Sequence, residues 1–398
     1  MSESSEGVTY PRGFLASGVR AGIKQQGEDV ALVFSERPAT SAGVFTRNIV
    51  KAAPVQVSEG RAFEFGTRAI IANSGNANAC TGKQGLRDAM DMAAETARLL
   101  DVSEEDVLVA STGLIGEPLP MEKIRSGIAE AVRSLSRDGG AAARAIMTTD
   151  TRPKEARAEL TIGGRTVRIG GMAKGAGMIC PDMATMLAFI TTDAAIEPRL
   201  LKQCLSDSAE VSFNCLTVDG DTSTNDTVFL LANGMAENPR IDSEGPDLEA
   251  FQKALDSVTT SLAKQIARDG EGATKLIDIT VRGAESFGDA RQVAKTVANS
   301  SLVKTAMFGA DPNWGRVLAA AGRSGVEFNP DAVNLSFGDT RLVQAGEPVE
   351  FSEEWAHEYL SGSEVSVLIE IGDGPGSATV WTCDFSYDYI RVNAEYHT

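Results

Sequence analysis

The sequence predicts an α/β protein in which short buried strands alternate with amphipathic helices. Hydrophobic residues make up 42% of the chain, and 39 glycines provide many tight turns. Short apolar runs alternate with segments that repeat their apolar residues at helical spacing. A chain of 398 residues is too long for one ordinary core, so we expect two domains or one large layered domain.

The expected strands are apolar runs bounded by turn residues. They cover residues 29–35, 42–45, 69–72, 107–111, 186–190, 332–337, 365–371, 378–385 and 389–392, with a hairpin over 160–169 that turns at Gly163-Gly164. The expected helices carry an apolar face. They cover residues 86–100, 121–135, 199–210, 248–268, 290–300 and 315–321, and a further one holds His357 in EEWAHEYL.

Charge and hydropathy exclude several classes of partner. The chain has 37 basic and 55 acidic residues, a net charge of −18, which argues against nucleic acid or an anionic membrane. No run approaches the roughly 20 apolar residues that span a bilayer. The beginning, MSESSEGVTYPRG, lacks the basic and apolar regions of a signal peptide, so the expected location is cytoplasmic.

Cysteine and histidine are scarce. The five cysteines form no Cys-x-x-Cys pair, which favours reduced, mostly buried thiols over a disulfide framework or a zinc site: Cys80, Cys180, Cys204, Cys215 and Cys383. The two histidines, His357 and His397, do not lie in a motif that would place them beside a nucleophile. We therefore expect chemistry that does not use histidine.

Residues 174–193, KGAGMICPDMATMLAFITTD, run from a glycine-rich loop into an apolar strand, with Ala184-Thr185 at the junction. If Thr185 Oγ attacks the Ala184 carbonyl, an N→O acyl shift and hydrolysis cut the chain. Thr185 then carries both a hydroxyl and an α-amine, whose pKa of roughly 7.7–8.0 suits a general base. An ordinary strand threonine is the alternative.

Three further segments have both a functional and a structural interpretation, and phosphate binding at a fourth is a weak alternative. A hydroxyl and a glycine amide at Thr112-Gly113 suit an oxyanion hole or a plain turn. The Asn/Gly-rich residues 73–82 suit an anion site or a strand-to-helix turn. Residues 217–227, TVDGDTSTNDT, could ligate Ca²⁺ or Mg²⁺ or form a turn cluster. The run GGMAKGAG, residues 170–177, lacks the order of a phosphate-binding loop.

Taken together, these pieces resemble the ornithine acetyltransferase family of arginine biosynthesis, also called glutamate N-acetyltransferase. The resemblance runs nearly from end to end, and the central MATML block is its most specific part. The matching blocks are GFLASGVRAGIK, TSAGVFTRNIVKAAPV, ANSGNANACTG, STGLIG, IMTTDT, KGAGMICPDMATMLAFITTDA, VDGDTSTNDT, FGADPNWGR and YDYIRVNAEYHT.

The resemblance implies roles for individual residues. Members of the family cut themselves before a threonine, which here matches Ala184-Thr185 and makes Thr185 the nucleophile. Thr112 and Gly113 would stabilise the oxyanion. The implied substrate contacts are Lys174, Thr185, Glu271, Asn393, Thr398 and one of Thr148 or Thr149, of which we favour Thr148. A cationic Lys174 suits an α-carboxylate, and Glu271 suits the δ-ammonium of ornithine.

The resemblance also implies a fold and a reaction. The fold is a layered α-β-β-α sandwich with a smaller C-terminal α/β part. Both cleavage fragments contribute to it: an alpha fragment, 1–184, with the oxyanion hole, and a beta fragment, 185–398, with the nucleophile and the substrate-binding C terminus. Two alpha and two beta chains are expected to assemble.

The implied reaction moves acetyl from N2-acetyl-L-ornithine to L-glutamate by a ping-pong mechanism, giving ornithine and N-acetylglutamate. No metal or prosthetic group is implied. Acetyl-CoA is a second acetyl donor in the bifunctional variety, which uses the same catalytic set.

Two other functions fit parts of the sequence. An N-terminal-nucleophile aminopeptidase or amidase would use the same threonine with water as acceptor. An uncleaved ligand-binding protein would keep the pocket without the chemistry.

Overall fold

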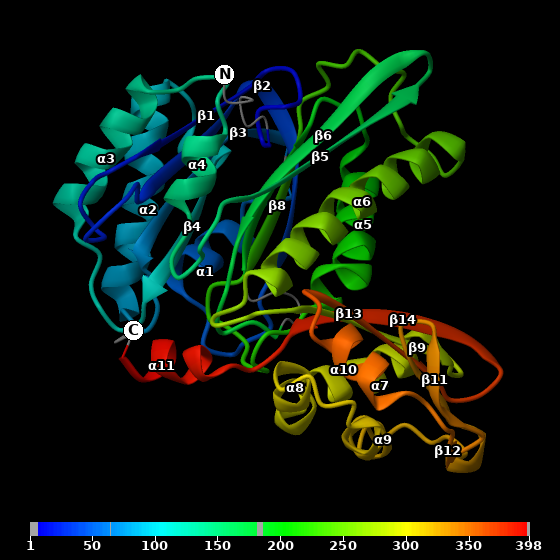
Figure 1. The fold of residues 1–398 in the computed structure, drawn as a ribbon. Helices are drawn as coiled ribbons and strands as arrows, with labels where there is room; N and C mark the ends of the chain where they lie inside the picture. Colours follow the sequence, from blue (N-terminus) through cyan, green and yellow to red (C-terminus); the bar gives the residue numbers. More distant parts are fainter. Residues whose placement is uncertain (1–6, 64, 181–185, 396–398) are drawn as a thin grey trace.

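The computed structural model describes residues 7–63, 65–180 and 186–395. Within these residues the strands form an eight-stranded and a six-stranded sheet (Figure 1). The larger sheet contains β1 (Phe14–Val19), β2 (Val30–Phe45), β3 (Phe65–Asn76), β4 (Val107–Leu114), β5 (Lys154–Ile162), β6 (Arg165–Lys174), β7 (Leu187–Thr192) and β8 (Thr227–Ala232).

The long strand β2 divides the larger sheet into two layers. Its first half, Val30 to Phe34, pairs with β1 and β3, and its last six residues, from Thr40 on, pair with β8. The pairing with β3 shifts register between Phe34 and Ala39, where bulged backbone bends a strand. The strand order β4-β3-β2-β8-β7-β6-β5 therefore continues from one layer into the other.

Three hydrophobic clusters show the layering. Ile70, Phe189 and Phe229 belong to the cluster between the two β layers, and the rings of the two phenylalanines stack at 5.8 Å. The outer cluster of one layer packs beneath α2 (Gly82–Leu100) and α3 (Met121–Arg133). The outer cluster of the second β layer packs beneath α5 (Pro198–Val211) and α6 (Pro246–Arg268). The expected α-β-β-α sandwich is confirmed.

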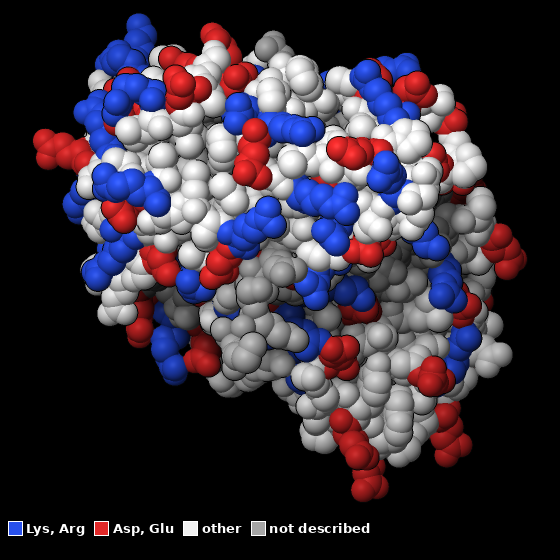
Figure 2. Space-filling model, turned by 90° about the horizontal axis from the view of Figure 1, so that it is seen from above, with Lys and Arg blue, Asp and Glu red and all other residues white. Residues whose placement is uncertain are grey.

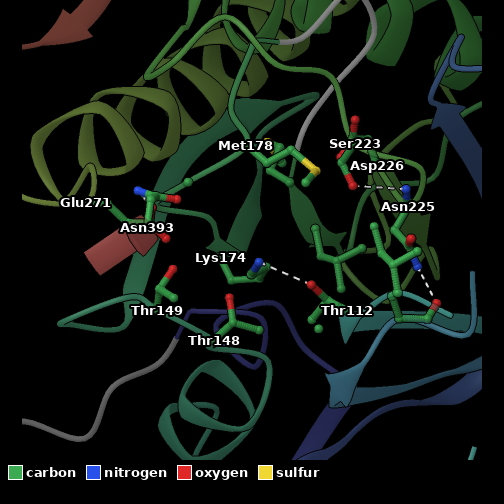
Figure 3. A pocket seen from close by; sticks show the side chains of 16 residues that line it. Thr112, Thr148, Thr149, Lys174, Met178, Ser223, Asn225, Asp226, Glu271 and Asn393 are labelled. Carbon is green, nitrogen blue, oxygen red and sulfur yellow. Dashed lines mark hydrogen bonds between the residues drawn. The ribbon is translucent and has the colours of Figure 1, made fainter. Parts of the chain in front are cut away.

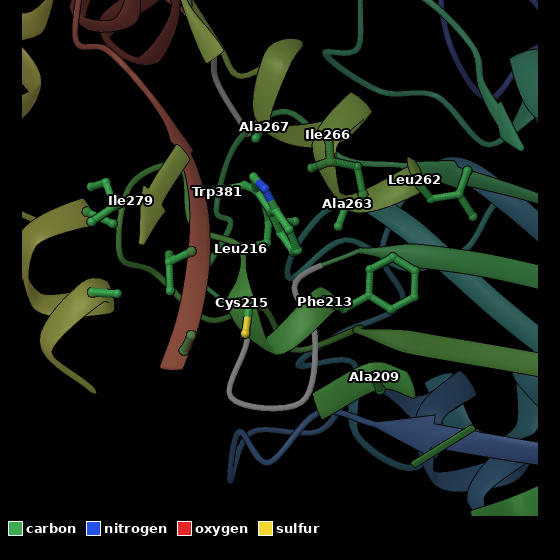
Figure 4. Packing of buried hydrophobic residues seen from close by; sticks show 14 of the residues in the cluster. Ala209, Phe213, Cys215, Leu216, Leu262, Ala263, Ile266, Ala267, Ile279 and Trp381 are labelled. Carbon is green, nitrogen blue, oxygen red and sulfur yellow. The ribbon is translucent and has the colours of Figure 1, made fainter. Parts of the chain in front are cut away.

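The smaller, C-terminal sheet has the order β12-β11-β10-β13-β9-β14. Its strands are β9 (Leu276–Gly283), β10 (Asn334–Phe337), β11 (Thr340–Gln344), β12 (Glu347–Pro348), β13 (Glu364–Glu370) and β14 (Gly374–Cys383). The accompanying helices are α7 (Phe287–Ala298), α8 (Ser301–Phe308), α9 (Trp314–Gly322) and α10 (Glu353–Leu360). Trp381 packs beside Leu216 and Ala263, so the sandwich and the C-terminal part share one core (Figure 4).

The short elements complete the fold. They are α1 (Ala53–Glu59), α4 (Gly140–Ala145), the 3-10 turns Glu104–Asp106, Phe213–Cys215 and Pro330–Ala332, and α11 (Tyr387–Glu395). The hairpin turn at Gly163-Gly164 has positive φ at both residues, 55° and 76°, as a type I′ turn requires.

The expected strand over residues 389–392 is wrong, because these residues lie within α11. Tyr, Ile and Val favour strands, but local contacts of helical spacing prevail here. Arg391 bonds the Asp388 carboxylate at 2.7 Å, Asn393 donates to the Tyr389 carbonyl at 3.0 Å, and Tyr389 stacks on Phe385.

The surface carries charges of both signs, and four of the five cysteines are buried. Acidic and basic side chains are interspersed on the face shown in Figure 2. Among the described residues, no helix has the length and apolarity to cross a membrane. All five cysteines lie in the described ranges and none of them is in a disulfide, and Cys80 alone of the five is exposed.

Candidate active site

One pocket, with a cavity volume of about 150 Å³, gathers most of the residues singled out in the sequence (Figure 3). It lies where several strands and loops of the sandwich end, beside α11. Its lining is formed by Ala77, Thr112, Gly113, Ile115, Thr148, Thr149, Lys174, Gly177, Met178, Met186, Leu187, Ser223, Asn225, Asp226, Glu271 and Asn393.

Thr112 and Gly113 lie at the end of β4, where β4 pairs in parallel with β3 and Gly113 stands opposite Gly75. Gly113 has a φ of +132°, and a Cβ there would lie 2.3 Å from the carbonyl carbon of Gly75. Only glycine fits this close approach of two strands. Thr112 and Gly113, the two residues expected to form an oxyanion hole, thus both lie on the pocket wall.

Lys174 is the last residue of β6 and is only 8% exposed. Its Nζ donates a hydrogen bond to Thr112 Oγ1 at 3.2 Å. Burial lowers the pKa of the Lys174 ammonium, and the neighbouring Asp150 carboxylate opposes that effect. Lys174 therefore places a buried amino group beside the candidate oxyanion hole.

Glu271 stands on the turn that follows α6. Its backbone N–H donates to the Ala176 carbonyl at 2.8 Å, and its carboxylate accepts a hydrogen bond from Asn393 Nδ2 at 2.9 Å. A Cβ at Gly177 would lie 2.4 Å from this carboxylate, so glycine lets the two segments meet. Asn393, on α11, fixes the orientation of the acid at the edge of the pocket.

Thr148 and Thr149 both line the pocket, so both expected alternatives are present. The Thr148 amide donates to Asp150 Oδ2 at 3.0 Å, and the Gly175 amide donates to Asp150 Oδ1 at 2.7 Å. Asp150 thus ties the threonine loop to the end of β6. Burial raises the pKa of Asp150, but the charges of Lys154 and Lys174 and the Gly175 amide outweigh it and lower the pKa to about 2.

Residues 217–227 join the pocket walls by hydrogen bonds. Asn225 Nδ2 donates to the carbonyls of Ala77 and Ser111 at 2.6 and 2.8 Å. The Asp219 carboxylate accepts the amides of Met178 and Ile179 at 2.6 and 2.8 Å. No group of three His, Cys, Asp or Glu in the described part of the chain could hold a metal ion.

Sequence reasoning missed three polar lining residues, Ser223, Asn225 and Asp226, although their segment had been singled out for its density of polar side chains. That density was the available signal, and it indicated a metal site or a turn instead of a pocket wall.

Ala184, Thr185 and Thr398 lie outside the described residues. The next residues after Thr185, Met186 and Leu187, line the pocket. Leu187 begins β7 between Lys174 of β6 and Thr227 of β8. The chain on the C-terminal side of the expected cleavage point therefore starts at this pocket.

A layered α/β sandwich whose pocket combines hydroxyl, amino and carboxylate side chains has the features of a protein that binds a small charged ligand. The family model of the ArgJ family matches residues 15–398, and the chain belongs to this family. It is an acyltransferase of arginine biosynthesis, and the resemblance drawn from the sequence is confirmed.

Curated relatives match over almost the whole chain. The arginine biosynthesis bifunctional protein ArgJ of Symbiobacterium thermophilum is 54% identical over 396 residues, 98% of each chain. ArgJ of Bacillus subtilis is 48% identical over 392 residues, 98% of this chain and 96% of its own. The crystal structure of ArgJ from Bacillus halodurans is 48% identical with a TM-score of 0.52, and the match covers 53% of this chain and 100% of that one.

Proposed function

We propose that this protein transfers the acetyl group of N2-acetyl-L-ornithine to L-glutamate through an acetyl-Thr185 intermediate. One observation carries the proposal. Thr112, Gly113, Lys174, Glu271 and Asn393, which come from four separate segments of the chain, line a single pocket with both candidate threonines of the 148–149 loop.

The charges of the pocket complement this donor. N2-acetylornithine carries an α-carboxylate and a δ-ammonium, and its acetylated nitrogen lies next to the carboxylate. Lys174 supplies a cation for the carboxylate, and Glu271, held by Asn393, supplies an anion for the ammonium. A carboxylate bound at Lys174 brings the acetyl carbonyl towards Thr112, the hydrogen-bond partner of Lys174.

The first half-reaction acylates the enzyme. The Thr185 α-amine accepts the hydroxyl proton as Thr185 Oγ attacks the acetyl carbonyl. Thr112 Oγ1 accepts its bond from Lys174, so its own proton can be donated to the oxyanion together with the Gly113 amide. The tetrahedral intermediate collapses, the C–N bond breaks, and ornithine leaves with the proton. The amine of glutamate then attacks the acetyl ester and regenerates Thr185.

The nucleophile arises by cleavage at Ala184-Thr185, with residues 1–184 and 185–398 as the fragments. The Bacillus halodurans chain supports separate fragments, since all of it matches only 53% of this chain. We also propose an assembly of two alpha and two beta chains. The word bifunctional in the names of the relatives supports acetyl-CoA as a second acetyl donor.

Two measurements test this function. Intact mass should show two chains for the wild type and one 41.9 kDa chain for Thr185→Ala. Initial rates with both substrates varied should give parallel double-reciprocal plots. Intersecting plots would contradict the acetyl-enzyme, and acetate release at the same rate without glutamate would identify an amidase that uses water.

A further inference from the structure

A buried ion cluster lies directly behind the pocket. It consists of Asp150, Lys154 and Asp269, and we call it the Lys154 cluster. Lys154 Nζ lies 2.5 Å from Asp150 Oδ1 and 2.6 Å from Asp269 Oδ2. The side chains of these three residues are 0%, 0% and 2% exposed. No residue of the cluster lines the pocket.

The two carboxylates also bind the backbone of the pocket walls. Asp150 accepts the amides of Thr148 and Gly175, which lie on the threonine loop and next to Lys174. Asp269 accepts the amide of Thr151 at 3.0 Å and a bond from its hydroxyl. Asp269 itself begins the turn that presents Glu271. The cluster therefore connects three walls that come from distant parts of the chain.

The cluster also balances charge around Lys174. Among the buried side chains, one ammonium and two carboxylates leave one negative charge beside Lys174. The more exposed Arg152 guanidinium also approaches Asp269, with 3.5 Å between Nε and Oδ1. The charged groups that act on Lys174 are Asp150, Lys154, Asp226, Glu271 and, more weakly, Lys24. Asp150 is the strongest of those that favour the charged form of Lys174, whereas Lys154 disfavours it.

Stability alone gives no reason for such a cluster. A buried ion pair is often replaced by hydrophobic residues of the same volume without loss of stability, because desolvation offsets the attraction of the charges. Each carboxylate of the Lys154 cluster instead accepts hydrogen bonds from backbone amides of the pocket walls. This arrangement fixes geometry and charge at the site.

We propose that Asp150, Lys154 and Asp269 are positioning residues that hold the threonine loop, Lys174 and the Glu271 turn in register and set the charge of Lys174. The inference rests on the proposed function, because it takes Lys174 as the carboxylate-binding cation. The cluster does not touch the substrate, so it acts through the residues that do.

The test compares pH profiles of four proteins. The variants are Asp150→Asn, Lys154→Met and the exposed control Glu159→Gln, whose carboxylate pairs with Arg168 at 3.3 Å on the same hairpin. Ornithine affinity by calorimetry and kcat/KM for N2-acetylornithine are measured from pH 6 to 10. Intact mass and thermal unfolding verify that each variant is cleaved and folded.

At high pH, ornithine affinity and kcat/KM should fall, and we call this fall the alkaline limb of the pH profile. The two cluster variants should shift the alkaline limb in opposite directions. Substrate binding needs the Lys174 ammonium, so binding is lost as pH rises through its pKa. Removing the Asp150 charge should shift this limb by about one unit to lower pH, which weakens ornithine binding about tenfold above the limb. Removing the Lys154 charge should shift the limb to higher pH. Glu159→Gln should leave the limb unchanged.

A cluster with only a structural role gives a different result. Both cluster variants would then lower thermal stability and activity by the same factor at every pH, and an unmoved limb in both overturns the inference. Lys154→Arg, which keeps the charge, covers the case in which Lys154→Met does not fold, and it should restore the wild-type limb. A wild type that is inactive towards N2-acetylornithine contradicts the proposed function, whereas an active wild type with unmoved limbs contradicts only the inference.

Discussion

Lys174 Nζ and Thr112 Oγ1 are joined by a 3.2 Å hydrogen bond that links the end of β6 to the end of β4. Because Lys174 Nζ is the donor, Thr112 Oγ1 accepts this bond and keeps its own proton for another acceptor. The hydroxyl is therefore preorganised before substrate arrives, and this is the condition under which an oxyanion donor contributes most.

Thr112→Val should lower kcat because it removes this donor while it keeps the branched shape of the side chain. Loss of one oxyanion donor costs about 10²–10³ in kcat. The KM for N2-acetylornithine should change little, because the charges at Lys174 and Glu271 remain. Steady-state kinetics on the cleaved enzyme measure the effect. Thr112→Ser, which keeps a hydroxyl, is the matched control, and equal losses in both variants would contradict the role.

Gly113→Ala should destabilise the site through its backbone. The variant combines a φ of +132° with a Cβ 2.3 Å from Gly75. Backbone strain of this kind costs about 1–3 kcal/mol, and the steric clash adds to it. Gly116→Ala is the control, because its φ is +88° with nothing within 4 Å of the added Cβ. Urea unfolding should show a larger loss in the free energy of unfolding for Gly113→Ala than for Gly116→Ala. Equal losses would show that the close approach to Gly75 does not restrict residue 113.

Glu271→Gln should discriminate between the two substrates. A hydrogen bond to a charged group contributes about 1.5–3 kcal/mol, so the KM for N2-acetylornithine should rise roughly 10- to 100-fold. Glutamate has no side-chain ammonium, so its KM should change far less. Asp388→Asn, on α11 where the acid pairs with exposed Arg391, is the control. A uniform rise in both KM values would argue against an ammonium partner.

Periodicity in the sequence predicted most of the long helices and many of the strands, whereas the layered sandwich was implied by the family resemblance. The sequence did not predict the strands β1, β8, β9, β11 and β12 or the short helices α1, α4 and α8. The segment before β8 was interpreted as a turn cluster or a metal site, and a short apolar run such as β8 cannot be distinguished from a buried helix segment by periodicity alone. It also assigned α11 to a strand, since propensity alone cannot register the stacking of Tyr389 on Phe385. Local pattern identifies elements and gives little information about which distant segments stabilise them.

The residues of the site also divide into those that the sequence predicted and those that it did not. Thr112, Lys174, Glu271 and Asn393 were named from the sequence through the resemblance, and the structure brings them to one pocket. The Lys154 cluster was not anticipated, because Asp269 lies more than one hundred residues beyond Asp150 and Lys154, and each of the three is an ordinary charged residue in its own segment. The sequence does not show which charged residues are buried together, so such a cluster is recognised only once the structure gives its ion-pair partners.

Acid should destabilise the protein through Asp150. Its pKa is lowered from 3.8 to about 2, and a carboxyl with a depressed folded-state pKa stabilises the fold above its unfolded pKa. That stabilisation is lost as pH falls from about 4 to 2, because the unfolded chain takes up the proton first. It amounts to roughly 2 kcal/mol. Asp150→Asn, which cannot titrate, should be less stable at pH 6 and should lose less stability between pH 5 and 2. Urea unfolding across this range measures both slopes, and parallel slopes would show that Asp150 does not carry this part of the acid response.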